Sequence, residues 1–242
     1  MFGFDPIYLI IMVVSLAMAG AASFYVKVRF ARGQRVALRS GMSGHEIAER
    51  ILHHEGLSDV TVHEHDGFLS DHYNPATKTL HLSPPVYRGR DAAAAGVAAH
   101  EVGHALQHAR GDLTMWGRTI LVYPAHFGSM LAPFLIMIGL FMAGGALIPG
   151  STGHVIAVAG VVLFAVSTVC SLLIVGNELN ASKRAKIALT EMGITTPGEE
   201  DDTVRGVLNA AAMTYMAAAL TSLLHLLHFA FIVFGQRSGE ER

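Results

Sequence analysis

The stretch AAHEVGHALQHA, residues 98–109, holds three histidines spaced four residues apart, and a glutamate directly follows the first of them. On a helix His100 and His104 lie on one face, so both imidazoles can reach one metal ion. Glu101 is rotated off that pair, where its carboxylate can accept a proton from metal-bound water. Zinc lowers the pKa of such water to about 7. The pattern therefore predicts one catalytic Zn²⁺ in a hydrolase that acts on amides, with Glu101 as the catalytic residue.

The third zinc ligand is not obvious, because a catalytic zinc usually takes three protein ligands. A helix rises about 1.5 Å per residue, so His108 lies about 12 Å along the axis from His100. Zn–N bonds are only about 2.1 Å long, and one ion cannot bridge so many turns. We therefore expect a downstream carboxylate. Glu178 is the first candidate, with an ordinary interfacial glutamate as the alternative, and Glu191 and the acidic cluster 199–202 are the others.

The composition is that of a membrane protein. The 242 residues are 52% hydrophobic and only 15% charged, and the mean hydropathy is +0.43. A soluble domain of this length is rarely so apolar. The net charge of −2 gives no support for a nucleic-acid partner. The single cysteine, Cys170, excludes a disulfide within the chain and disfavours a cysteine-based metal site.

Four segments reach the length of about 20 mostly apolar residues that a bilayer core requires. They lie at about 7–26, within 121–148, at about 154–176 and at about 211–234. All four should be helices, because lipid offers no partner for unpaired backbone groups. Pro124 and Pro133 are expected to bend the second segment.

The charges predict an orientation. The chain begins with only Asp5 as a charged residue and becomes basic after the first apolar segment, which favours a retained anchor over a removable signal peptide. The positive-inside rule then places the N-terminus outside and residues 27–120 and 177–210 in the cytoplasm. We expect a multi-pass protein of a bacterial-type inner (plasma) membrane, with its active site on the cytoplasmic side.

Residues 40–112 form the main polar block, and their patterns predict a small α+β part. The expected elements are a helix capped by Ser43 and Glu46 and closed by Gly56, short strands over 59–63 and 77–83, and the motif helix between Asp91 and Gly111. The fold class is therefore mostly α: an integral membrane protein with about four transmembrane helices and a small α+β zincin-like extramembrane part.

The chain is expected to divide into five segments. These are an N-terminal transmembrane anchor (1–26), a cytoplasmic zincin-like part with the HExxH helix (27–120), transmembrane helices two and three (121–176), a cytoplasmic helix and acidic loop with the third zinc ligand (177–210), and the fourth transmembrane helix with a short tail (211–242).

Three stretches carry a family resemblance: FLSDHYNPATKTLHLSPPVY, GVAAHEVGHALQHA and NELNASKRA. In this order among these spans they resemble the YugP-type neutral zinc metallopeptidases, a family of membrane proteases. The layout is more distantly similar to that of the HtpX and CAAX-processing membrane metallopeptidases, which pair HExxH with a later glutamate in E-x-x-A-D. Glu178 and Ala181 match that pattern, whereas Ser182 replaces the acid. The resemblance implies Glu178 as the third zinc ligand, beside His100 and His104.

Several other side chains could contribute to catalysis, substrate binding or packing. His72, Tyr73 and Tyr215 are candidates to stabilise an oxyanion. The strand 77–83 either binds extended peptide along its edge or is purely structural. His225 and His228 share a face of the fourth apolar segment, where an interhelical hydrogen bond suffices to explain them. Six further histidines lack ligand spacing and are expected at the surface or in packing: His45, His53, His54, His63, His65 and His81.

The function predicted from these features is that of a membrane-anchored zinc endopeptidase. Its expected partners are the lipid bilayer and membrane or membrane-proximal protein substrates; no oligomeric state is indicated. One alternative is a non-catalytic membrane scaffold or adaptor with a structural zinc. Another is a site-2-type intramembrane protease, but the motif helix has only about 15 apolar residues between its flanking charges, too few for a normal span.

Overall fold

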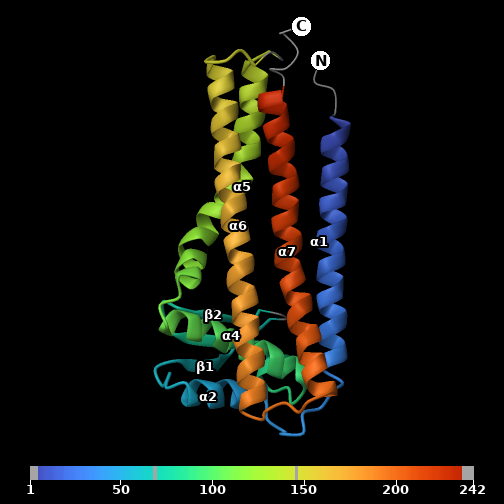
Figure 1. Ribbon diagram of the computed structural model, residues 1–242, viewed down its shortest axis with the longest axis vertical. Coiled ribbons are helices and arrows are strands. Elements are labelled where there is room, and N and C mark those ends of the chain that lie inside the picture. Colours follow the sequence, from blue (N-terminus) through green and yellow to red (C-terminus); the bar gives the residue numbers. More distant parts are fainter. Residues whose placement is uncertain (1–4, 68–69, 145–146, 236–242) are drawn as a thin grey trace. The chain divides into compact units, whose positions relative to one another are not determined.

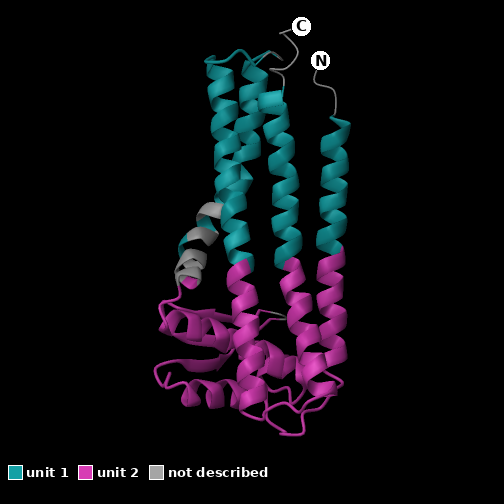
Figure 2. Ribbon diagram, in the orientation of Figure 1, with its two compact units in different colours: residues 1–20, 117–175, 215–242 teal, residues 21–116, 176–214 magenta. Residues whose placement is uncertain are grey.

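The computed structural model describes residues 5–67, 70–144 and 147–235, apart from some side chains near the start of helix α5 (Figure 1). Its elements follow in the order α1 (Pro6–Gly33), α2 (Gly44–His54), β1 (Thr61–Glu64), β2 (His72–Asn74), β3 (Thr79–Leu82), α3 (Pro84–Tyr87), α4 (Ala92–Ala109), α5 (Leu113–Met142), α6 (Thr152–Glu191) and α7 (Glu199–Phe234). The chain forms two compact units: residues 1–20, 117–175 and 215–242, and residues 21–116 and 176–214 (Figure 2).

The chain is mostly helical, and among the described residues three helices are long and apolar enough to cross a membrane. These are α1, α6 and α7. The fourth predicted span falls in α5, which continues as one helix through Pro124 and Pro133. Its described apolar part, His126–Met142, is shorter than the other three. A fourth crossing therefore stays a prediction.

The first unit is held together by close helix packing and by polar contacts between apolar helices. A Cβ built on Gly139 of α5 would lie 2.5 Å from the backbone nitrogen of Ala157 in α6, so the two backbones nearly touch. The hydroxyls of Thr168 in α6 and Ser222 in α7 are 2.9 Å apart. Small residues and hydroxyls at such positions are typical of helices that associate in a bilayer.

The two histidines of α7 have separate partners in this unit. His225 donates its Nδ1–H to the carbonyl of Thr221 one turn earlier, at 2.8 Å. His228 lies with Nε2 at 3.1 Å from a carboxylate oxygen of Asp5, and the ring of Tyr8 stacks on it. His228 therefore contacts the residue before α1 as an ion pair, whereas the bond of His225 stays within α7, so an interhelical hydrogen bond for these two histidines stays a prediction.

The second unit contains a small mixed sheet with the order β1-β3-β2. Strand β3 pairs in parallel with β1 and antiparallel with β2. Of the two alternatives for residues 77–83, the pairing of both edges of β3 favours the structural strand over peptide binding along a free edge. The unpredicted strand is β2, whose three residues lie between the two strands predicted over 59–63 and 77–83. So short a strand carries no alternating pattern that a sequence could reveal.

The helices of the second unit begin and end as expected. Ser43 and Glu46 form a complete capping box at α2. Asp91 caps α4 by accepting a hydrogen bond from the backbone N–H of Ala94 at 2.9 Å. Gly111, just after α4, has a φ of +64°, a conformation that glycine adopts without strain. The caps fix where the motif helix starts and stops.

The acidic stretch 199–202 is the first turn of α7 and not a loop. Carboxylates stabilise a helix start because the dipole there is positive. The side chain of Glu200 also accepts hydrogen bonds from the backbone N–H groups of Arg39 and Thr196, at 2.9 and 2.8 Å. These bonds lower the pKa of Glu200 against the opposing effect of burial. The cluster therefore has a structural role.

Helix α4, which carries the HExxH motif, packs closely against α6. A Cβ built on Gly103 would lie 2.7 Å from the carbonyl oxygen of Ala181. Around it the alanines of both helices are buried, including Ala99, Ala181 and Ala185. Small side chains on both helices thus bring the HExxH segment against the middle of the NELNASKRA segment.

We predict that Gly103→Ala destabilises the protein, because the added methyl group must push α4 away from α6. Overpacking of this kind costs about 1–3 kcal/mol. Gly96→Ala is the matched control: Gly96 is on the same helix, and its Cβ would meet Val204 at an ordinary 3.5 Å. Thermal unfolding in detergent should show a lower midpoint for Gly103→Ala only. Equal midpoints for the two variants would contradict the close approach.

Candidate metal centre

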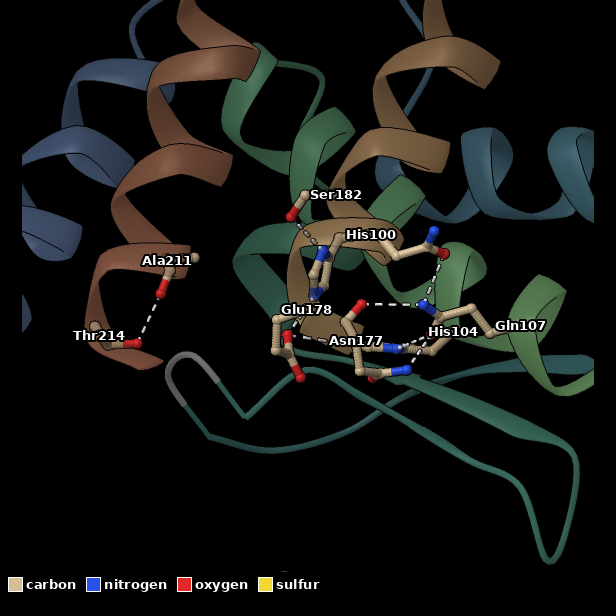
Figure 3. A network of polar contacts seen from close by, with 9 residues as sticks. His100, His104, Gln107, Asn177, Glu178, Ser182, Ala211 and Thr214 are labelled. Atoms are coloured by element: carbon tan, nitrogen blue, oxygen red, sulfur yellow. Dashed lines mark hydrogen bonds and ion pairs between the residues drawn. The ribbon is translucent and has the colours of Figure 1, made fainter. Parts of the chain in front are cut away.

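Two histidines of α4 and one glutamate of α6 converge in the second unit (Figure 3). The ligand atoms of His100, His104 and Glu178 all lie within 4.8 Å of one another. The Nε2 atoms of His100 and His104 are 3.1 and 3.6 Å from the same carboxylate oxygen of Glu178. His104 and Glu178 are buried and His100 is half-buried. Two imidazoles and one carboxylate are a donor set that zinc takes in catalytic sites.

Gln107 determines which nitrogen of His104 faces Glu178. The amide nitrogen of Gln107 lies 3.0 Å from the backbone carbonyl of Asn177, which can only accept a hydrogen bond. The amide oxygen of Gln107 must then be the atom at 2.9 Å from Nδ1 of His104. His104 therefore donates its Nδ1–H, and its Nε2 carries a lone pair toward Glu178. This is the tautomer that a metal ion requires.

A buried polar network extends from Gln107 into α6. Asn177 donates from Nδ2 to the oxygen of Gln107, and Gln107 donates to the side-chain oxygen of Asn180, both at 3.0 Å. Arg184 donates from Nε to the same oxygen of Asn180 at 2.7 Å and from a terminal nitrogen to Asp112 at 3.1 Å. Positions 177, 180 and 184 share one face of a helix. The network thus aligns the ligand-bearing parts of α4 and α6.

Ser182 takes the place of the missing acid. Its hydroxyl oxygen is 3.1 Å from Nδ1 of His100, and its side chain is buried. At the position where E-x-x-A-D has an acid, this chain therefore has a hydroxyl that contacts a predicted zinc ligand. Both imidazoles are held at Nδ1 by neutral side chains, and both present Nε2 to Glu178.

Glu101 is buried beside the sheet. Its charge acts on Asp71, whose pKa is raised first by burial and further by Glu101. Asp71 itself accepts hydrogen bonds from the backbone N–H and the hydroxyl of Ser83, at 2.7 and 3.0 Å. These bonds tie the start of β2 to the end of β3, next to the motif helix.

The remaining candidates have other partners. Nδ1 of His108 is 2.9 Å from the hydroxyl of Tyr73, whose pKa burial raises to about 12. His72 donates its Nδ1–H to the carbonyl of Ser70 at 2.8 Å and is exposed. Tyr215 is half-buried in α7 and belongs to the first unit. An oxyanion role for Tyr73, His72 or Tyr215 therefore stays a prediction.

Among the described residues, the metal group contains neither His108 nor Glu191 nor any acid of 199–202. The sequence reasoning had missed Gln107, Asn177 and Asn180. Gln107 lies three residues after His104, and Asn180 lies three residues after Asn177. Residues with this spacing share a helix face, which could have indicated polar groups beside the ligands.

The fold and the centre together define a membrane-associated protein of the zinc metallopeptidase class. The chain belongs to the family described as "Putative neutral zinc metallopeptidase", whose model matches residues 8–234. It is 38% identical over 235 residues to "Putative membrane protease YugP" of Bacillus subtilis (strain 168), a match that covers 96% of this chain and 98% of that protein. No solved structure matches the chain. The family resemblance drawn from the three stretches is confirmed.

We predict that Gln107→Leu weakens zinc binding by about 10–100-fold, because the variant cannot accept the Nδ1–H of His104. It also leaves the buried amide of Asn177 without its acceptor. Gln34→Leu, at an exposed position of the same unit, is the control. Competition with a chromophoric chelator measures the affinity independently of any catalytic activity. Equal zinc affinity for Gln107→Leu and the native protein would show that the network does not position the ligand.

Proposed function

We propose that the protein is a membrane-anchored zinc endopeptidase that cuts membrane or membrane-proximal proteins. The observation that carries this proposal is the convergence of His100, His104 and Glu178, with Glu101 next to the first ligand, in a chain of the zinc metallopeptidase family. The curated relative is described as a membrane protease, which agrees with the three apolar helices.

The residues of the centre fit a zinc ion by the chemistry of their donors. When bound there, zinc supplies a water of lowered pKa and polarises the scissile carbonyl. His100 and His104 would hold it through Nε2, and Glu178 would hold it through a carboxylate oxygen. Glu101 takes the proton from the attacking water and returns it to the leaving amine. Gln107 keeps the imidazole of His104 in the required tautomer, and the hydroxyl of Ser182 contacts Nδ1 of His100.

Three protein ligands rather than four support a catalytic over a structural zinc. A catalytic site keeps a position for water or substrate, whereas a structural site is closed by four protein ligands. Within the described part of the chain, the group that could hold an ion contains two histidines and one glutamate. This disfavours the scaffold with a purely structural zinc.

The surroundings of α4 disfavour the site-2-type alternative. Among the described residues, α4 is not one of the helices apolar and long enough to span a membrane. It packs against α2 and α3, and Ala98 and Val102 are part of a core shared with Leu80 of the sheet. A short sheet beside an HExxH helix supports the zincin-like character proposed for residues 27–120.

The membrane placement rests on helix continuity and charge. Glu178 belongs to the same uninterrupted helix, α6, as the apolar residues 154–176. Because this ligand follows a candidate membrane span so closely along the chain, we expect the substrates to be cut at or near the bilayer. The basic residues after the first span support a cytoplasmic site with the N-terminus outside. In this scheme α5 supplies the fourth crossing.

We predict that Glu101→Gln abolishes peptide hydrolysis and leaves zinc bound, because glutamine cannot accept a proton but occupies the same volume. Glu199→Gln, at an exposed carboxylate of α7, is the control and should behave as the native protein. Membrane fractions of cells that carry each form can be compared by quantitative proteomics. Specific membrane proteins should accumulate uncleaved with Glu101→Gln alone. Loss of zinc from Glu101→Gln, or identical membrane fractions, would speak against this role for Glu101.

A further inference from the structure

Four histidines lie on one face of the sheet. The sequence indicated no relation between them: three were expected at the surface or in packing, and the fourth, His72, was a candidate to stabilise an oxyanion. His63 in β1, His81 in β3 and His72 in β2 stand in one row, because His81 is the register partner of both others. His65 follows β1, and its backbone N–H continues the ladder by donating to the carbonyl of Leu82 at 2.8 Å. Alternation along a strand puts His63 and His65 on the same face. The four are called the histidine face below.

The histidine face is turned away from the core. Leu80 and Leu82, the neighbours of His81 in β3, are completely buried, as is most of Tyr73 beside His72. Side chains alternate between the two faces of a strand, so the histidines lie on the opposite side from these residues. His63, His65 and His72 are exposed and His81 is half-buried. A solute can therefore reach their rings.

The rings are spaced as ligands of one ion would be. The ring centroids of His72 and His81 are 4.8 Å apart, those of His65 and His81 are 5.6 Å apart, and those of His65 and His72 are 5.7 Å apart. In a tetrahedral zinc site with bonds of about 2.1 Å, two imidazole centroids lie about 5 Å apart. The rings of His100 and His104 in the candidate metal centre have a spacing of 4.8 Å.

The chemistry of the face also suits a metal ion. His72 gives its Nδ1–H to the carbonyl of Ser70, so its Nε2 carries a lone pair. The pKa of His81 is lowered by burial and then by its neighbours His72, His65 and His63, which favours a neutral imidazole at His81. Neutral imidazole is a ligand for zinc, copper and nickel, whereas calcium and magnesium prefer oxygen.

We propose that His65, His72 and His81, with His63 beside them, form a second site for a divalent transition metal. Of the described residues, only the group in the candidate metal centre has ligand atoms already within 4.8 Å of one another. Binding at the histidine face therefore requires the rings to turn. Exposure allows this for His65 and His72, and half-buried His81 must exchange the contact of its Nε2 with the hydroxyl of Thr79, at 3.0 Å, for the metal. The site takes Zn²⁺ by side-chain rotation, without movement of the strands that fix its spacing.

The test is a zinc titration of the full-length protein in detergent after removal of all metal. The native protein should bind two zinc ions, and the double variant His72→Asn/His81→Asn should bind one. His100→Asn/His104→Asn should also bind one, at the histidine face. His53→Asn/His54→Asn removes two exposed histidines of α2 that are not part of the histidine face, and this variant should still bind two.

The outcomes separate this inference from the proposed function. If the native protein and His72→Asn/His81→Asn bind the same number of zinc ions, the second site is wrong. If one ion binds and is lost only with His72→Asn/His81→Asn, the second site stands and the candidate metal centre fails. Should the double variant fail to fold, the single variant His65→Asn must weaken one of the two zinc ions. Unchanged affinity for both in His65→Asn would overturn the inference.

Discussion

Helices α4 and α6 approach so closely at Gly103 that any larger side chain there would meet the backbone of Ala181. This contact decides the geometry of the candidate metal centre, because two of its donors stand on one helix and the third on the other. His100 and His104 gain a common direction from the four-residue spacing on α4 alone. Glu178 reaches them only because a glycine and a set of alanines remove the side-chain layer that normally keeps helix axes about 8–10 Å apart.

Such a contact would be costly without a way to satisfy the polar groups that it buries. Gln107, Asn177 and Glu178 are essentially removed from solvent, and an unpaired buried polar group costs about 1–3 kcal/mol. Asn177 donates a hydrogen bond to Gln107 across the interface, and Gln107 donates one to Asn180. Arg184 also donates to Asn180. Hydrogen bonds between buried groups are strengthened by the low dielectric around them, and such networks are rigid. The same bonds that stabilise the helix pair therefore also hold the imidazole of His104 in the tautomer that a metal needs.

The sequence predicted the parts of this arrangement that depend on local chemistry. The capping box at Ser43, the cap at Asp91 and the HExxH motif each depend on residues only a few positions apart in the chain. Each is found where the sequence predicts it. The family match confirms the resemblance from which Glu178 was singled out. Strand β2 and the histidine face were missed, because register between strands depends on tertiary pairing and leaves no spacing signal along the chain. The role of Ser182 was missed for a similar reason: only the approach of α6 to α4 shows that its hydroxyl meets His100.

The central claim is that one zinc ion is held by two helices at once, through His100, His104 and Glu178. Zinc X-ray absorption spectroscopy tests it most directly, on a His72→Asn/His81→Asn background that leaves only the candidate metal centre to fill. The predicted first shell contains two imidazole nitrogens, with oxygen atoms as the remaining ligands. Glu178→Ala should keep both imidazole signals and weaken the affinity for zinc. A shell of three or four imidazoles, or a zinc affinity that does not change in Glu178→Ala, would contradict the account.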